Sequence, residues 1–139
     1  MVASSSLPKG VWDKEDRLIL NEYPSNSAAD SFIMRPENNV SVRKIPLTTI
    51  DQLIKDFGLS RVDMIKMDIK GATQRALSGG TQTLARGKRP RLAISTEESA
   101  DNPKEIAFFV ESLRLGYQVA CGDCAVSSYT VRPTVLLLQ

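Results

Sequence analysis

The hydrophobic and polar positions of this chain fall into short blocks that predict strands and helices in alternation. Residues 62–72 (VDMIKMDIKGA) form an apolar run stopped by turn formers, which is typical of a buried strand followed by a turn. Residues 91–95, after Pro90, predict a second buried strand. Because ligands bind outside the carboxyl ends of such strands in open α/β sheets, the pattern places Asp68 and Lys70 where chemistry is expected.

The segment that begins at Thr49 predicts a helix with one apolar face. Thr49 and Gln52 have the spacing of a capping box, in which each side chain pairs with the backbone amide of the other residue. Gly58 is placed to end the helix as its C-terminal cap. The apolar residues that recur at helical spacing between these ends are Ile50, Leu53, Ile54 and Phe57.

Two more helices are predicted further along the chain. The first covers residues 73–85, and the pair Gly79 and Gly80 lowers its intrinsic stability. The second begins at Pro103, a residue suited to the first helical position, and ends at Gly116. The residues expected to face the core are Ala76, Leu77, Leu84, Ile106, Phe109, Val110 and Leu113, and the cap of the second helix is Asp101 or Asn102.

The remaining pattern predicts short strands and one α/β domain. Residues 1–9 lack periodicity and predict a disordered N-terminus, residues 24–39 predict a loop, and residues 10–139 predict a single domain. The order of elements predicts a sheet of parallel strands with an antiparallel C-terminal edge. The short strands are expected at residues 10–12, 17–23, 40–45, 117–121 and 134–138, of which the last two are close enough to form an antiparallel pair.

Composition narrows the classes of function. The chain has 139 residues, of which 42% are apolar and 24% charged, as in an ordinary globular domain. Its net charge is +2 without a long basic block, so we expect no nucleic-acid partner. No apolar run is long enough to span a bilayer and the N-terminus lacks the pattern of a secretory signal, so we expect no membrane association and a cytoplasmic location.

The chain contains no histidine, which removes the commonest general base and the commonest metal ligand. We therefore expect no metal site, and any catalysis must use carboxylates, lysines, cysteines, tyrosines or a cofactor. Glu97 and Glu98 follow the strand at residues 91–95, in the position equivalent to Asp68 on its neighbour. Such acids can perform acid/base work or bind a cation, and the alternative is that they are simply solvated.

The cysteines are spaced as Cys121-x-x-Cys124. A redox pair of this spacing normally lies at a helix N-terminus, whereas this pair follows a predicted strand. A zinc site needs four ligands, which two chains would have to share. The sequence favours reduced thiols, with redox or metal function as the alternatives.

Several segments taken together resemble the FkbM-type family of S-adenosylmethionine-dependent methyltransferases. They are IPLTTIDQL at residues 45–53, DMIKMDIKGA at 63–72, ALSG at 76–79, RPRLAIS at 89–95 and LGY at 115–117. The similarity extends from residue 7 onward. It implies a truncated Rossmann-like methyltransferase sheet, corresponding to the C-terminal half of the family fold.

The resemblance also implies a site and a cofactor. Asp68 and Gly71 match the family pattern after the fourth strand and are expected to bind S-adenosylmethionine, whereas Lys70 replaces a glutamate. The catalytic residues expected are Asp68, Lys70, Glu97 and Glu98. The glycine-rich turn of the family is missing, so we expect that the chain does not bind the cofactor alone. The alternatives are a dimeric module without methyltransferase activity, or an enzyme that uses repurposed carboxylate chemistry.

The resemblance finally implies an open sheet edge. In the family the first strand pairs with the fourth, which is residues 62–67 here. Without that neighbour the strand has a bare apolar edge, which natural proteins cover or pair. We expect it to be covered by residues 17–23 or by the same strand of a second copy, and a homodimer is the simpler closure.

Overall fold

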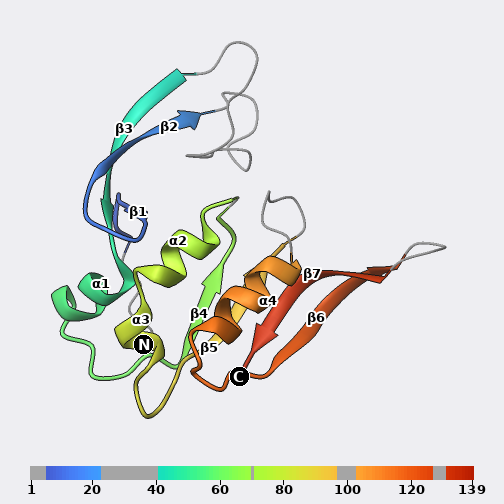
Figure 1. Ribbon diagram of the computed structural model, residues 1–139. Coiled ribbons are helices and arrows are strands. Elements are labelled where there is room, and N and C mark those ends of the chain that lie inside the picture. The colour runs from blue at the N-terminus through green and yellow to red at the C-terminus, as the bar shows by residue number, and fades with distance from the viewer. Residues whose placement is uncertain (1–5, 23–40, 70, 97–102, 127–130) are drawn as a thin grey trace.

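The computed structural model describes residues 6–22, 41–69, 71–96, 103–126 and 131–139. These residues form a mixed α/β fold with two sheets, of order β1-β3-β2 and β4-β5-β7-β6 (Figure 1). The strands are β1 (Gly10–Val11), β2 (Arg17–Glu22), β3 (Ser41–Thr48), β4 (Met64–Met67), β5 (Arg91–Ser95), β6 (Val119–Val126) and β7 (Val131–Leu138). The helices are α1 (Ile50–Asp56), α2 (Thr73–Ser78), α3 (Thr81–Leu84) and α4 (Pro103–Ser112).

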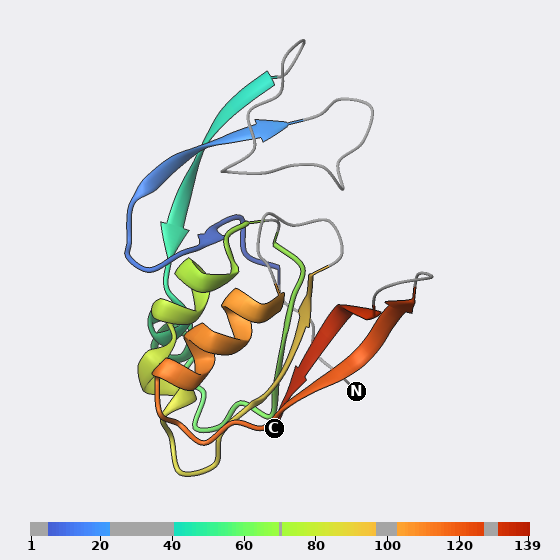
Figure 2. The ribbon, with the colours of Figure 1, turned by 45° about the vertical axis from the view of Figure 1, so that its right-hand side comes forward.

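The four-stranded sheet confirms the predicted combination of parallel strands and an antiparallel edge. β4 and β5 are parallel, with Met67 paired to Ile94, and β7 is antiparallel to both β5 and β6. α2 and α4 lie on the same side of this sheet (Figure 2). The core between them contains side chains that are at most 1% exposed, namely Leu77, Leu84, Leu92, Ile94, Ile106 and Leu138. The burial of these apolar side chains is the main stabilising contribution to this part of the fold.

β4 is less buried than the sequence predicts. Met64 is 52% exposed, although Met67 is only 5% exposed. β4 is the end strand of its sheet and therefore has a neighbouring strand on one side only. β5, which has strands on both sides, is the fully buried strand that the pattern predicts, with Leu92 and Ile94 at 1% and 0% exposure.

A second, three-stranded sheet was not expected as a separate unit. β1 is parallel to β3 and β2 is antiparallel to β3, and both β2 and β3 extend away from the helices (Figure 1). The prediction that residues 17–23 cover β4 is wrong for the described part of that segment. All six residues of β2 pair instead with β3, from Arg17 opposite Pro46 to Glu22 opposite Ser41. The alternative, a second copy at β4, stays a prediction.

α1 is confirmed, with one difference in its capping. Thr49 Oγ1 accepts a hydrogen bond from the Gln52 amide at 3.0 Å, as predicted. The reciprocal half of the capping box is wrong, because Gln52 Nε2 donates to Asp56 Oδ1 at 2.6 Å. Gly58 has a φ of +61° at the C-terminal end, and the next amide returns to the carbonyl of Ile54. A residue without a side chain is favoured at this left-handed position.

The predicted helix over residues 73–85 is wrong, because the chain breaks at Gly79 and Gly80 into α2 and α3. A Cβ on Gly79 would collide with the backbone oxygen of Trp12, so β1 and its turn pack directly against the break. The Asp51 carboxylate accepts hydrogen bonds from the amides of Gln82 and Thr83 at 3.0 and 2.7 Å and so caps α3. These partners lie far away in the sequence, and they replace the hydrogen bonds that a continuous helix would have made.

The C-terminal part matches the prediction in type and differs in length. α4 ends at Ser112, four residues before Gly116, and the turn contains Arg114 and Gly116 at φ values of 53° and 70°. β6 and β7 form the predicted antiparallel pair and are longer than expected, at eight residues each. Cys121 and Cys124 are joined by a disulfide on β6, next to two register shifts, whereas the sequence favours reduced thiols. Across the described residues no helix is long and apolar enough to cross a membrane.

Candidate functional site

Asp68 lies at the carboxyl end of β4, immediately after the buried Met67. Its side chain is exposed. Because β4 and β5 are parallel and Met67 pairs with Ile94, Asp68 and Ser95 follow at the same edge of the sheet. The structure therefore puts Asp68 where an open α/β sheet normally binds its ligand.

Gly71 forms the turn between β4 and α2. Its φ is +73°, a left-handed conformation that other residues rarely adopt. The following amide, of Ala72, donates to the carbonyl of Ile69 at 2.9 Å, and the side chain of Ala72 is only 4% exposed. This turn fixes the direction in which the chain leaves Asp68 and enters the core.

The other predicted site residues, Lys70, Glu97 and Glu98, lie outside the described residues. Their approach to Asp68 is therefore still a prediction. The structure does describe Thr96, the last residue before the acidic pair. Thr96 is fully buried, its hydroxyl donates to the carbonyl of Pro133 at 2.8 Å, and its amide donates to the carbonyl of Thr134 at 2.8 Å. The chain that carries Glu97 thus departs from a point anchored on β7, at the same edge as Asp68.

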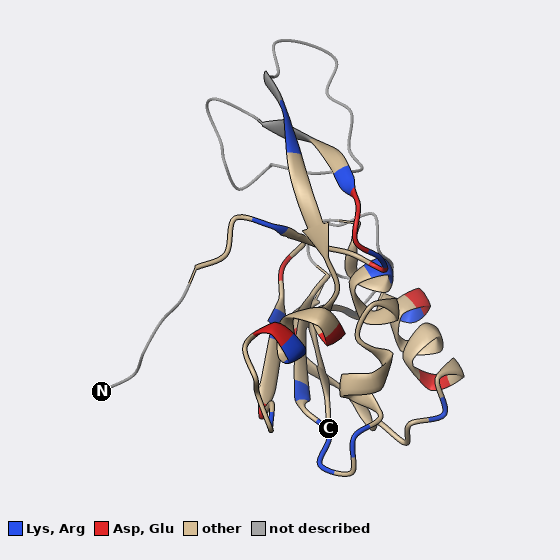
Figure 3. Ribbon diagram, turned by 90° about the vertical axis from the view of Figure 1, so that its left-hand side faces the viewer, with Lys and Arg blue, Asp and Glu red and all other residues tan. Residues whose placement is uncertain are grey.

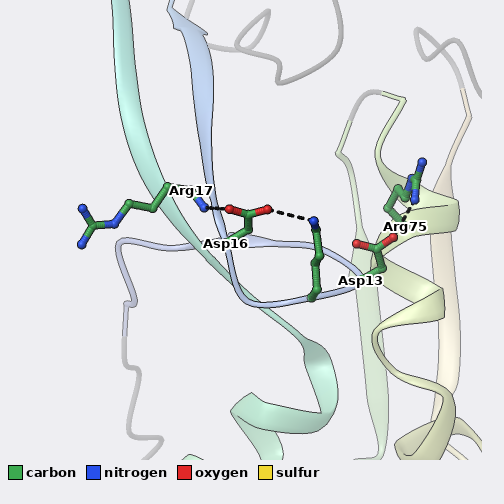
Figure 4. A network of polar contacts seen from close by, with 5 residues as sticks. Asp13, Asp16, Arg17 and Arg75 are labelled. Atoms are coloured by element: carbon green, nitrogen blue, oxygen red, sulfur yellow. Dashed lines mark hydrogen bonds and ion pairs between the residues drawn. The ribbon is translucent and has the colours of Figure 1, made fainter.

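A second group of charges lies between the β1–β2 turn and α2 (Figure 4). Asp13 pairs with Arg75 of α2 at 2.7 Å, and the Arg75 guanidinium lies 5.9 Å from the Trp12 ring centroid. The backbone amide of Arg17 and the ammonium of Lys14 both donate to Asp16, and they lower the pKa of its carboxyl. Asp13 and Asp16 thus each have a cationic partner, although Asp13 Oδ1 is buried without a hydrogen bond among the described residues.

Two hollows are lined by described residues alone, and Asp68 and Gly71 are in the lining of neither. The larger has a volume of about 410 Å³ and is polar, with Asp13, Thr49, Asp51, Gln52, Lys55, Ser78, Gly79, Thr81 and Gln82 around it. The Thr49 hydroxyl and the Asp51 carboxylate already accept hydrogen bonds from backbone amides, whereas Asp13 Oδ1 is buried and has no hydrogen-bond partner among the described residues.

The smaller hollow is an apolar groove of about 240 Å³ along β4. Its walls are Val11 of β1, Ile50, Leu53 and Ile54 of α1, Val62, Ile65, Lys66, Met67 and Ile69 in and around β4, and Ala76 of α2. The sequence analysis did not identify this groove as a site. The sequence signals that contribute to it are the apolar face of α1 and the apolar run that contains β4.

The described residues meet the demands of S-adenosylmethionine only in part. Asp68 is exposed at the expected edge and Gly71 leaves room beside it. The sequence has no glycine-rich turn to supply backbone donors, and neither hollow contains the two residues. The described part of the chain also holds no group of three potential metal ligands, and its acidic and basic residues are interspersed (Figure 3).

The parallel β4–β5 pair, its antiparallel extension and the acidic residue at the carboxyl edge form a mixed α/β domain. Residues 4–119 match the family model of the methyltransferase FkbM domain, and the chain belongs to this family. The match includes Asp68, Lys70, Gly71 and both glutamates, so the resemblance to the family is confirmed.

A solved structure supports the fold. The chain is similar to the methyltransferase FkbM from Methylobacillus flagellatus KT, with a TM-score of 0.58 and 21% sequence identity. The similarity covers 94% of this chain and 27% of that chain, so the sequence spans little more than a quarter of the length of that protein. No curated protein matches the chain.

Proposed function

We propose that this chain is part of a truncated Rossmann-like FkbM methyltransferase fold and does not bind S-adenosylmethionine by itself. The observation that carries the proposal is the position of β4. This strand holds Asp68 at its carboxyl end, yet it is the end strand of its sheet, with its outer side open in the described residues. One side of the expected cofactor site is therefore missing.

The reactive edge in this proposal is the shared carboxyl end of β4 and β5. Asp68 would accept hydrogen bonds from a polar ligand, and Lys70, Glu97 and Glu98 would complete the edge. S-adenosylmethionine, the cofactor implied by the family, would supply an electrophilic methyl group. Because the described residues do not fit that cofactor alone, no methyl transfer is assigned to the single chain.

The test is isothermal titration of S-adenosylmethionine and S-adenosylhomocysteine into the folded protein. We expect no binding at millimolar ligand. Asp68→Ala is the diagnostic variant and Asp63→Ala its control, since Asp63 is an exposed aspartate before the opposite end of β4, paired with Arg61. Micromolar binding that Asp68→Ala abolishes and Asp63→Ala retains would show that this chain builds a working cofactor pocket, and would overturn the proposal.

The second candidate is a binding module without methyltransferase activity. The apolar groove along the open side of β4 supports this candidate. Exposed apolar surface is typical of interaction sites, and a sheet that continued beyond β4 would have no use for it. A homodimer through residues 62–67 and a cytoplasmic location belong to this candidate as proposals.

A further inference from the structure

Two loops lie side by side at the end of the four-stranded sheet that is opposite Asp68 (Figure 1). Residues 57–63 connect α1 to β4, and residues 85–90 connect α3 to β5, so both loops precede the amino ends of the parallel strands. A hydrogen bond joins them, because Arg86 Nη1 donates to the carbonyl of Leu59 at 3.4 Å. Residues 57–61 and 86–91 therefore form one surface, which we call the amino-edge surface.

The second loop and the first residue of β5 make this surface basic. They carry four cations and no acid, as the lower end of Figure 3 shows for the loop. The Arg89 guanidinium lies 5.3 Å from the centroid of the Tyr117 ring, an uncharged partner that leaves the positive charge in place. All four cations are exposed, and none of them forms an ion pair with a described residue: Arg86, Lys88, Arg89 and Arg91.

Acidic residues near the first loop do not neutralise these cations. Asp63 pairs with Arg61 of its own loop. Asp56, the last residue of α1, accepts a hydrogen bond from the Gln52 side chain one turn back along the helix, at 2.6 Å. The amino-edge surface thus keeps an excess of positive charge that a partner with negative charge would complement.

Two apolar side chains lie beside the cations. Phe57 is 50% exposed and Leu59 is 45% exposed, and neither belongs to the core cluster. Gly58 between them is also open, since nothing lies within 4 Å of a Cβ placed there. The sequence pattern assigns Phe57 to the apolar face of α1, whereas in the structure half of its surface is available to a partner.

We propose that the amino-edge surface binds the headgroup region of a membrane that contains anionic phospholipids. Lysine and arginine are attracted to the negative surface of such a membrane, and exposed phenylalanine and leucine enter the boundary between headgroups and acyl chains. A soluble polyanion would use the charges but leave the two apolar side chains in water, so a lipid surface fits the combination better.

This attachment is compatible with the other features of the chain. The expectation of no membrane association rests on the lack of a segment that could span a bilayer, and attachment to the surface needs no such segment. The inference is also independent of the proposed cofactor behaviour, because Asp68 follows the opposite end of β4.

The probe is a pair of vesicle preparations, one of phosphatidylcholine alone and one of equal parts phosphatidylcholine and phosphatidylserine. Sedimentation of the full chain with the vesicles measures binding. Each basic residue near an anionic surface strengthens binding about fivefold, so four of them should give a preference of roughly a hundredfold or more for the phosphatidylserine vesicles. Raising the salt concentration from about 0.1 M to about 1 M shortens the screening length from about 10 Å to about 3 Å and should remove most of this preference. Equal binding to both preparations, or binding to neither, would overturn the proposal.

Charge variants then locate the surface. Lys88→Glu reverses one charge of the amino-edge surface and should weaken binding to the phosphatidylserine vesicles by about tenfold or more. Lys44→Glu makes the same change at an exposed lysine of β3 and should leave binding nearly unchanged. Equal effects of the two variants would contradict the proposal, because binding would then follow the net charge of the chain and not the position of the charge.

Apolar variants distinguish a membrane from other polyanions. Phe57→Ser should weaken binding to the same vesicles by about fivefold, because the burial of half a phenylalanine side chain is lost. Phe108→Ser is the matched control on α4, where Phe108 is 74% exposed, and should leave binding unchanged. No effect of Phe57→Ser, together with tighter binding to single-stranded RNA than to the vesicles, would overturn the proposal and identify a nucleic acid as the partner.

Discussion

The two sheets of this chain are stabilised in different ways. In the four-stranded sheet, Leu92, Ile94, Leu136 and Leu138 are at most 4% exposed and pack against the helices. In the three-stranded sheet, Ile19 is 51% exposed. The buried side chains described in this sheet lie at the end of β3. One sheet therefore depends on an apolar core, and the other depends mainly on strand pairing.

The three-stranded sheet, called the outer sheet below, is attached to the rest of the molecule at one end. Two backbone hydrogen bonds hold the β1–β2 turn to β3 within this sheet: the amide of Trp12 donates to the carbonyl of Thr48 at 2.8 Å, and the amide of Leu47 donates to the carbonyl of Asp16 at 2.7 Å. Contacts to the rest of the molecule come from the same turn. Gly79 packs against the Trp12 carbonyl, and Arg75 pairs with Asp13. Because the side chains of this sheet contribute little to the apolar core among the described residues, we expect the outer sheet to open locally while the four-stranded sheet stays folded.

The largest effect should come from the core. Ile94→Ala removes a fully buried side chain from the centre of the four-stranded sheet and should lower the free energy of unfolding by about 2–5 kcal/mol. Ile19→Ala in β2, with half of its side chain exposed, should cost under about 1 kcal/mol. Urea denaturation measures both variants. Similar losses for the two would mean that both sheets share one core.

A smaller effect should follow when the outer sheet is detached. Gly79→Ala forces a Cβ against the backbone oxygen of Trp12 and should cost about 1–3 kcal/mol. In hydrogen exchange, the amides of β2 and β3 should lose protection before those of β5. Gly87→Ala is the control, because nothing lies within 4 Å of a Cβ placed there. Equal loss of protection in both sheets would show that they unfold together.

Alkaline pH should act on the four-stranded sheet. Tyr117 donates its hydroxyl proton to the Pro90 carbonyl at 2.9 Å, and burial raises the pKa of this phenol although Arg89 nearby opposes the rise. The folded state thus favours the neutral form. Its stabilisation is present below the ordinary value of 10.0 and is lost as pH rises through the folded pKa. The loss should be under about 1 kcal/mol. Tyr117→Phe should remove this pH dependence, and thermal melts at several pH values would detect a dependence that remains.

The smallest effect should come from acid, and it should act on the outer sheet. The Arg17 amide and Lys14 lower the pKa of Asp16, so the folded state favours the carboxylate. This stabilisation is present above the ordinary value of 3.8 and is lost as pH falls through the folded pKa. Amide chemical shifts of Arg17 and Leu47 should therefore move with acid titration, and Asp16→Asn should abolish the movement of Arg17. Shifts that persist in the variant would assign the titration to another group.

Local signals made part of this fold predictable. The cap at Thr49, the apolar stripe after it and Gly58 lie within ten residues of one another, and they placed α1 correctly. The break at Gly79 could not be placed in the same way, because its cause is the carbonyl of Trp12, far away in the sequence. The pairing of β2 with β3 could not be predicted for the same reason, because alternation of apolar and polar residues identifies a strand but not the strand that it pairs with.

In the candidate site, too, local sequence signals were predictive and contacts between distant segments were not. The strand pattern located Asp68 at a carboxyl edge, and the parallel register of β4 and β5 supports that position. The groove on the other side of β4 was missed because its walls, Leu53 and Ile65, come from two elements that each looked like ordinary core. A sequence shows that such residues are apolar, whereas only the assembled sheet shows that part of their surface lacks a neighbour.

Asp51 has a consequence for the order in which the chain folds. It belongs to the first turn of α1, yet its carboxylate holds the amides of Gln82 and Thr83 at the start of α3. α3 has four residues, and helices this short do not persist in isolation. We therefore expect α3 to form only after α1 has closed a loop of about thirty residues and delivered the carboxylate.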